Sequence, residues 1–172
     1  DLTGYHILYE PLEAIASRLQ LIDKAEKTLD LQYYIWDNDT IGSLALYKII
    51  QAADRGVKVR LLMDDNNAKA MEAVYLALDQ HQNIDVKLFN PYRLRRLRPV
   101  EMIIDLKRIN RRMHNKTFTA DNQITLIGGR NMSNQYYNVS ENYQFSDVDV
   151  MLVGQAVEDI THSFDEYWNH SY

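Results

Sequence analysis

The chain has 172 residues, of which 46% are hydrophobic and 25% are charged, and its formal net charge is −5 at pH 7. These values predict one globular domain with a sizeable core, and three prolines and six glycines argue against a fibrous or disordered chain. The sequence contains neither a run of about 18 apolar residues nor a charged-then-apolar leader, and the absence of cysteine excludes disulfides and thiolate metal sites. The chain opens at Asp1 rather than at methionine, which indicates a fragment of a longer protein.

Helical and extended patterns alternate in the first half of the chain. Apolar side chains recur at helical spacing after Pro11, which itself suits the first turn of a helix. Runs of aliphatic and aromatic residues after each helical segment read as strands. The pattern therefore predicts helices at residues 11–28, 41–55 and 68–80, and strands at residues 29–36, 57–63 and 84–89.

The second half continues with strands and ends in a helix. Strands are expected at residues 113–120 and 123–127, joined by the polar pair Asp121-Asn122, and a later strand at 147–153 precedes a helix at 157–168. The order of strands and helices predicts a parallel or mixed sheet that is flanked by helices on both sides. No repeat or linker divides the chain, so residues 1–172 are expected to form a single domain.

One spaced motif in the second half points to phosphate chemistry. The pattern His-x-Lys-x4-Asp-x6-Gly-Gly-x-Asn consists of His114, Lys116, Asp121, Gly128, Gly129 and Asn131. Alternation along a strand would place the imidazole and the ammonium on one face, where both can address the same small anion. A histidine nitrogen is a nucleophile near neutral pH, and a phosphodiester reacts when cations and amide donors hold its oxygens. Two adjacent glycines let a backbone approach such an anion closely.

This motif resembles the signature of the phospholipase D superfamily. By that resemblance His114 is the catalytic histidine, Lys116 and Asn131 are phosphate ligands, and Asp121 is a structural acid that ties the motif to its surroundings. Gly129 departs from the common pattern, because many members carry there a serine whose hydroxyl helps to hold the phosphate. The resemblance implies no metal and no other cofactor.

Several stretches resemble one branch of that superfamily, the bacterial cardiolipin synthases and phosphatidylserine synthase-like proteins. They are residues 29–36, 60–67, 112–116 and 128–131, and the resemblance runs from about residue 12 to the end. It implies an α-β-α sandwich around a central mixed, mainly parallel sheet. It also implies a phosphatidyltransferase or phospholipase D that acts on anionic glycerophospholipids through a phosphohistidine. Such a protein would be bacterial and would associate peripherally with the inner membrane.

A histidine nucleophile needs a third group that orients it, normally a carboxylate on its far nitrogen. Asp147 and Asp149 lie on one face of the strand expected at residues 147–153, and family members carry an acidic residue at the start of the corresponding strand. Asp147 is favoured over Asp149. The alternative is that both carboxylates merely solvate an exposed strand face.

Positive charge is concentrated directly before the motif. Residues 93–112 hold eight basic and two acidic residues, a net charge of +6 that leaves −11 for the rest of the chain. Such a patch can attract an anionic headgroup, a membrane surface or a nucleic-acid backbone, and Arg111, Arg112 and Arg130 are candidate headgroup or membrane contacts. The alternative is a solvated surface or pairing with the acidic remainder. Within this segment residues 100–106 fit either an amphipathic helix on a membrane or, as we favour, a helix docked on the protein.

The chain carries one motif where the chemistry requires two acid–base groups. A phosphohistidine mechanism needs a second group that protonates the leaving alcohol, and in the resembled family this group is a histidine from a second copy of the motif. None of the remaining histidines is followed two residues later by lysine: His6, His81, His162 and His170. The chain is therefore interpreted as the N-terminal half of a two-motif enzyme. The alternative is a metal-independent homodimeric phosphodiesterase or endonuclease, and a third reading is a non-catalytic lipid-binding half-domain.

Two further groups of residues are given structural roles. Residues 64–67, Asp-Asp-Asn-Asn, follow a strand and precede a helix, and a helix cap is the simpler account of them. Tyr136 and Tyr137 follow Asn131 and are candidates for packing or for lining a lipid or nucleotide site.

Overall fold

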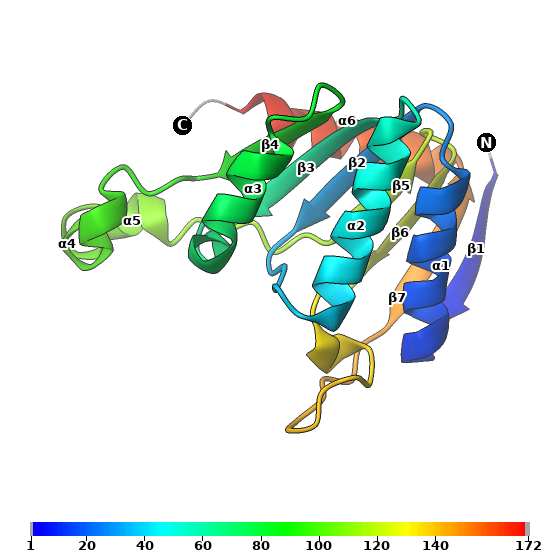
Figure 1. Cartoon of the computed structure of the whole chain (residues 1–172), viewed down its shortest axis with the longest axis horizontal. Helices are drawn as coiled ribbons and strands as arrows, with labels where there is room; N and C mark the ends of the chain where they lie inside the picture. Colours follow the sequence, from blue (N-terminus) through cyan, green and yellow to red (C-terminus); the bar gives the residue numbers. More distant parts are fainter. Residues whose placement is uncertain (1, 171–172) are drawn as a thin grey trace.

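The computed structural model describes residues 2–170, apart from the side chain of Arg96. A seven-stranded sheet forms the centre of the molecule, and helices cover both of its faces (Figure 1). The strands follow the order β1-β7-β6-β5-β2-β3-β4. Their bounds are β1 Thr3–Leu8, β2 Thr28–Tyr33, β3 Lys58–Asp64, β4 Ile84–Phe89, β5 Thr117–Ala120, β6 Ile124–Gly128 and β7 Asp149–Gly154.

The predicted mixed sheet with helices on both sides is confirmed, but the expectation that the sheet is mainly parallel is wrong. Strands β2, β3 and β4 pair in parallel. The four other pairings in the described part of the chain, β1–β7, β7–β6, β6–β5 and β5–β2, are antiparallel. The reason is that helices connect the first strands as parallel crossovers, whereas β5 and β6 are joined by a tight turn.

The helices form two layers. Helices α1 (Pro11–Lys24), α2 (Thr40–Asp54) and α3 (Glu72–Leu78) lie on one face of the sheet, and α6 (Gln155–Asn169) lies on the other (Figure 1). Pro11 occupies the first turn of α1, as its sequence position predicted. Asp39 caps α2, because its carboxylate accepts a hydrogen bond of 2.9 Å from the backbone N–H of Gly42.

The predicted elements are present with shifted ends, and one strand was not predicted. The helix expected at residues 68–80 consists of a short 3-10 helix, η1 (Ala68–Met71), followed by α3. Strand β1 has no predicted counterpart: it is an edge strand whose first four residues are exposed, so it lacks the alternation of a half-buried strand. The strand expected from residue 113 begins only at Thr117, which places His114 and Lys116 in the loop before it.

Residues 93–112, between β4 and β5, project from the body and are called the arm. It contains the 3-10 helix η2 (Arg95–Leu97) and two short helices, α4 (Arg98–Ile104) and α5 (Leu106–Ile109). These helices stand apart from the sheet, beyond the end of α3 (Figure 1). Within residues 2–170 we find no helix of the length and apolar character that a bilayer crossing requires.

A buried ion cluster joins α1, β7 and the segment after β6. The carboxylate of Asp149 has no exposed surface, and it lies 2.9 Å from a guanidinium nitrogen of Arg18 and 3.4 Å from one of Arg130. Both guanidinium groups are also buried and donate to backbone carbonyls, Arg18 to Ala14 and Arg130 to Leu8 and Tyr9. The cluster therefore connects the first helix to the strand that borders the candidate site.

We expect Asp149→Asn to lower the free energy of unfolding by about 3–5 kcal/mol, because it leaves two buried cations without their counter-charge. Urea unfolding of the wild type and the variant measures this difference. Asp23→Asn is the matched control: it removes a carboxylate whose side chain is 49% exposed and which pairs with Lys48, and its cost should stay below about 1 kcal/mol. Equal costs for the two variants would contradict the role assigned to the cluster.

Candidate active site

The motif residues other than Asp121 lie at the edge of the sheet where β2, β3 and β6 end and where β5 and β7 begin. His114 is exposed in the loop before β5, and Lys116 beside it is buried. Tyr34 follows β2, and its ring centroid lies 4.9 Å from that of His114. This tyrosine was not predicted as a site residue. The available signal was strand alternation, because Tyr33 packs into the core and its neighbour must face the other way.

Lys116 and His114 contact each other, although not through alternation on a strand. The ammonium of Lys116 donates a 2.7 Å hydrogen bond to the backbone carbonyl of His114 and lies 3.1 Å from Nδ1 of its ring. It also lies 5.6 Å from the centre of the Tyr34 ring. The curved loop folds the lysine back onto the histidine, so both nitrogens face the same edge of the sheet.

A buried carboxylate at the end of β3 holds this loop. Asp64 accepts a 2.8 Å hydrogen bond from the backbone N–H of Met113, the residue before His114, and lies 3.2 Å from the guanidinium of Arg112. On the other side of Met113, the amide of Gln32 lies 2.9 Å from its sulfur. Burial raises the pKa of Asp64, and these donors oppose that effect.

The prediction of a helix cap at residues 64–67 is therefore wrong. Asp65 also turns away from η1: it is fully buried and accepts a 2.8 Å bond from the N–H of Tyr92. Asn67 precedes η1 without a side-chain cap. Both carboxylates bind segments that are distant in sequence, which local cap patterns do not reveal.

The charge of Lys116 responds to two opposing influences. Burial lowers its pKa below the ordinary value of a lysine, and the negative charge of Asp147 partly offsets that effect. An ammonium with little water around it interacts strongly with an arriving anion, since a low local dielectric constant strengthens charge interactions. Lys116 is thus suited to hold a phosphate oxygen.

Neither Asp147 nor Asp149 forms a hydrogen bond with His114 within the described part of the chain. Asp149 belongs to the buried cluster with Arg18 and Arg130, which excludes it as the partner of the histidine in this conformation. Asp147 is half-buried, its carboxylate accepts a 3.0 Å bond from the N–H of Val148, and its charge acts on Lys116. The direct contact between a carboxylate and His114 that the sequence predicted is absent. The charge of Asp147 acts instead on Lys116, which contacts His114.

The two glycines make room for β7 and its carboxylates. A Cβ on Gly128 would lie 2.5 Å from the backbone oxygen of Val148, and a Cβ on Gly129 would lie 1.9 Å from a carboxylate oxygen of Asp147. Side chains at either position would therefore displace neighbouring groups. At position 129, where many phospholipase D proteins carry serine, the Asp147 carboxylate fills the space.

Asn131 is buried and connects three segments. Its side-chain oxygen accepts a 3.0 Å bond from the N–H of Ile35, and its amide donates a 2.9 Å bond to the hydroxyl of Tyr136. One amide hydrogen is thereby directed to Tyr136, which packs against Phe145 at the rim, with ring centroids 4.9 Å apart. The side chain of Asn131 is thus held between the backbone of Ile35 and the hydroxyl of Tyr136.

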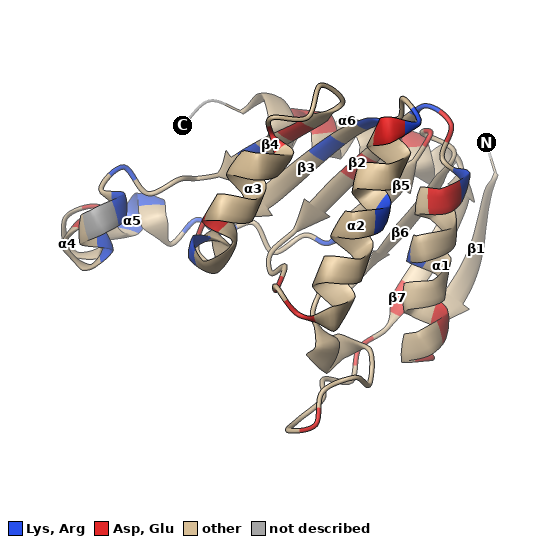
Figure 2. Ribbon diagram, in the orientation of Figure 1, with Lys and Arg blue, Asp and Glu red and all other residues tan. Residues whose placement is uncertain are grey.

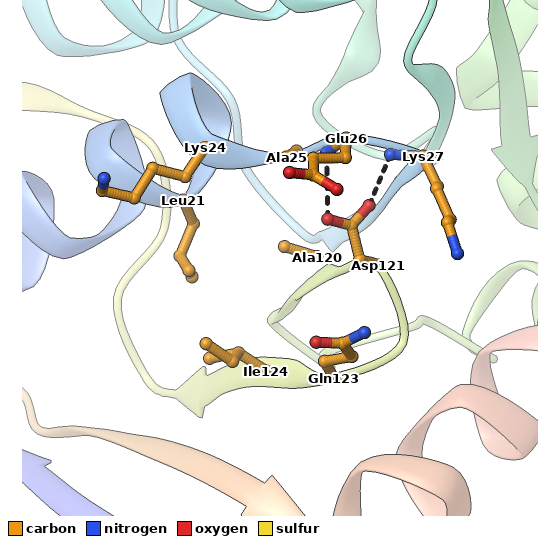
Figure 3. A pocket seen from close by; sticks show the side chains of 9 residues that line it. All are labelled: Leu21, Lys24, Ala25, Glu26, Lys27, Ala120, Asp121, Gln123 and Ile124. Atoms are coloured by element: carbon orange, nitrogen blue, oxygen red, sulfur yellow. Dashed lines mark hydrogen bonds between the residues drawn. The ribbon is translucent and has the colours of Figure 1, made fainter.

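Asp121 lies at the far end of β5 and has a structural environment. Its carboxylate accepts hydrogen bonds from the backbone N–H groups of Glu26, Lys27 and Thr28 at 2.9, 2.7 and 2.8 Å, two of which Figure 3 shows. Its φ of 53° is one that aspartate tolerates better than most residues. Burial alone would raise its pKa, but the backbone donors outweigh this and lower it. Asp121 thus fixes the start of β2 to the end of β5.

The three arginines expected to contact a headgroup have different positions. Arg111 is exposed, three residues before His114 in the chain. Arg112 is mostly buried and binds Asp64 and the carbonyl of Ile109. Arg130 is 1% exposed and bound to Asp149 and the β1 end, so its expected headgroup contact is wrong. The positive charge of Arg130 neutralises a core carboxylate instead.

The other histidines are occupied elsewhere. His6, His81 and His162 lie near the carboxylates of Glu13, Asp54 and Glu166 at 3.0, 3.2 and 3.7 Å. His170 follows α6 and lines a surface depression with Phe89 and Tyr167. Within residues 2–170 the site therefore contains one histidine, which is half of the acid–base pair that phosphodiester exchange requires.

We expect Asp121→Asn to lower the free energy of unfolding by about 1–2 kcal/mol at pH 7, because the amide nitrogen cannot accept the bonds that a carboxylate oxygen accepts. The folded-state pKa of Asp121 is lowered, so its contribution is present above the unfolded pKa and is lost as pH falls through the folded pKa. Urea unfolding at pH 7 and at about pH 3 should show a difference that shrinks with acidification. Asp159→Asn, on the exposed face of α6, is the control, and equal stability of Asp121→Asn and wild type at pH 7 would contradict this account.

Comparisons with known proteins agree with this fold. Residues 19–168 match the family model described as "Cardiolipin synthase, PLD-like domain". Cardiolipin synthase C of Escherichia coli is 48% identical over 165 residues, which cover 96% of this chain and 35% of that protein. The chain thus spans about a third of the length of this relative.

Two solved structures share the fold at low sequence identity. NucT from Helicobacter pylori aligns with a TM-score of 0.70 at 19% identity and covers 97% of this chain and 95% of its own. Phosphatidylserine synthase from Haemophilus influenzae aligns with a TM-score of 0.69 at 18% identity, over 96% of this chain and 37% of its own. These likenesses concern the arrangement of the elements. The family match over most of the chain leads to the conclusion that the chain belongs to the cardiolipin synthase family of phospholipase D-like domains.

Proposed function

We propose that this domain supplies one half of the active site of a phosphatidyltransferase that acts on anionic glycerophospholipids. The observation that carries the proposal is the contact between exposed His114 and buried Lys116, in a chain that is 48% identical to a cardiolipin synthase. The exposed imidazole can reach a phosphorus atom, and the ammonium behind it can hold the phosphate oxygens.

In the first step, a ring nitrogen of His114 forms a bond to phosphorus while the ester bond between phosphorus and the leaving glycerol oxygen breaks. The leaving alkoxide takes a proton from an acid that the second half provides. Lys116 lies against Nδ1, which leaves Nε2 as the nitrogen that faces outward. When Lys116 turns to a phosphate oxygen, Nδ1 is free to carry the ring proton and Nε2 is free to attack.

In the second step, an acceptor hydroxyl replaces the histidine on phosphorus. The base in the second half takes the proton of the acceptor, the oxygen–phosphorus bond forms, and the bond to His114 breaks. A lipid hydroxyl as acceptor gives cardiolipin, and water gives phosphatidic acid. Asp147 supports both steps because its negative charge favours the charged form of Lys116.

The second half is proposed to be a further motif-bearing domain of the same polypeptide. The chain covers 35% of the length of the E. coli synthase, which leaves room for another domain of this size. The alternative is that a second copy of this chain is the partner. The protein would then be a homodimeric nuclease. The alternatives predict different substrates, so one set of assays separates them. We further propose that the enzyme works while bound peripherally to a bacterial membrane, where its substrate resides.

We expect His114→Ala to reduce phosphatidyl transfer and hydrolysis by about 10³-fold or more, since the nucleophile is lost. The assay uses phosphatidylglycerol vesicles, EDTA and the longest natural polypeptide that contains this chain. The control is His162→Ala, which removes an exposed histidine on α6 and should leave the rate unchanged. Lipid turnover that persists in His114→Ala would contradict the proposal. Plasmid cleavage in EDTA without lipid turnover would favour the nuclease.

The rate should also report the protonation of Lys116. As pH rises through the pKa of Lys116, the lysine loses its charge and kcat/KM should fall, which gives an alkaline limb. Burial lowers this pKa, so the limb should lie at a lower pH than the titration of an ordinary lysine. Asp147→Asn removes a charge that raises the pKa, and the limb should then move to lower pH. Asp159→Asn, distant on α6, should not move it. A limb that moves upward or stays in place in Asp147→Asn would refute the coupling.

A further inference from the structure

The arm, residues 93–112, encloses a buried carboxylate. Glu101 is 2% exposed, and its carboxylate accepts bonds from the backbone N–H groups of Arg93 and Leu94 at 3.0 and 2.6 Å. The same carboxylate pairs with the guanidinium of Arg108, which also binds Asn90 at 2.6 Å. Glu101 thus joins the start of the arm to Arg108 near its end.

A second carboxylate attaches the arm to the body. Asp65 is fully buried at the end of β3, and the guanidinium groups of Arg95 and Arg98 both lie 3.2 Å from it. Arg98 also lies over the ring of Tyr92, at 4.5 Å from its centre. Ion pairs with Asp65 therefore help to hold the arm in a defined position.

The outer surface of the arm is aliphatic, which is the reverse of the docked helix expected from the sequence. Ile103 is 82% exposed and Ile104 is 70% exposed. Five more large apolar side chains of the arm are between 40% and 56% exposed: Leu94, Leu97, Val100, Met102 and Leu106. A helix of a globular protein normally buries its apolar stripe, and a group of exposed aliphatic side chains marks a surface that contacts something else.

The charges next to this apolar surface are positive. Arg95, Arg98, Arg108 and Arg112 pair with carboxylates of the protein. Arg93, Lys107 and Arg111 are exposed, and within residues 2–170 their side chains form no ion pair. Figure 2 shows the concentration of basic residues along the arm. Apolar side chains beside unpaired cations complement a surface with an apolar interior and anionic headgroups.

We propose that the outer face of the arm docks the protein on an anionic phospholipid bilayer. Ile103 and Ile104 enter the boundary between headgroups and acyl chains, and Arg93, Lys107 and Arg111 lie at the lipid phosphates. The proposal rests on the proposed function for the identity of the bilayer, whose lipids are the substrate. It goes further because it assigns the membrane contact to a defined surface.

The arm is also placed to bring the site to the lipid. Helix α5 ends at Ile109, and the chain continues from there directly into Met113 and His114. Asp64, the last residue of β3, binds the loop that contains His114. The next residue, Asp65, binds the arm. A bilayer bound by the arm is therefore near the edge of the sheet that carries His114.

Vesicle sedimentation with the longest natural polypeptide tests this proposal. We expect the wild type to bind vesicles of phosphatidylglycerol and phosphatidylcholine, and Ile103→Asp/Ile104→Asp to weaken that binding by about tenfold or more. Arg93→Glu/Lys107→Glu should also weaken vesicle binding. Even the wild type should bind poorly to vesicles of pure phosphatidylcholine. Leu12→Asp on α1, at a position that is 68% exposed, is the matched control and should bind as the wild type does.

Two further measurements keep this test separate from the proposed chemistry. His114→Ala should bind vesicles as the wild type does, and the arm variants should keep their turnover of a short-chain phosphatidylglycerol dissolved as monomers. Binding of Ile103→Asp/Ile104→Asp within about twofold of wild type would overturn the proposal. A change in oligomeric state of that variant in gel filtration, with vesicle binding retained, would also overturn it and would assign the surface to a protein partner. Loss of short-chain turnover in His114→Ala alone would leave the docking result untouched.

Discussion

Two consecutive carboxylates at the carboxyl end of β3 organise everything that lies beyond this edge of the sheet. Asp64 binds the N–H of Met113 and so positions the loop that contains His114, while Asp65 binds Tyr92, Arg95 and Arg98 and so positions the arm. Both are fully buried, and a buried carboxylate without partners is costly, so the two segments cannot leave without a large penalty. The His114 loop and the proposed membrane surface are therefore held by two adjacent residues of the chain.

The electrostatics of the site follow from a close approach of backbones. Because position 129 is glycine, the carboxylate of Asp147 lies where a side chain of residue 129 would stand, and from there its charge reaches Lys116. Burial lowers the pKa of Lys116, and the carboxylate of Asp147 raises it. A carboxylate thus occupies the space where many members of the superfamily carry a serine hydroxyl, and its charge acts on Lys116.

Much of this architecture was predictable because it is local. Periodicity predicted the helices and buried strands, including β4 at residues 84–89, and the spaced motif predicted the family. The pairing of edge strand β1 was not predictable in the same way, because this strand is mostly exposed and pairs with β7, about 150 residues later. The loop of His114 resembles a strand in sequence, yet its backbone bonds to the side chain of Asp64. The prediction that residues 100–106 dock on the protein failed for a related reason. Buried ion pairs occupy the interior of the arm, and most of its apolar side chains are exposed.

The measurement that tests the central claim most directly is the chemical trapping of the intermediate. The longest natural polypeptide would be mixed with phosphatidylglycerol, quenched within its first turnovers and analysed by peptide mass spectrometry. The account predicts a phosphatidyl group on the peptide that contains His114, at a ring nitrogen, and its disappearance when acceptor lipid is added before the quench. Turnover accompanied by an adduct on a histidine outside this domain would contradict the assignment of His114 as the nucleophile.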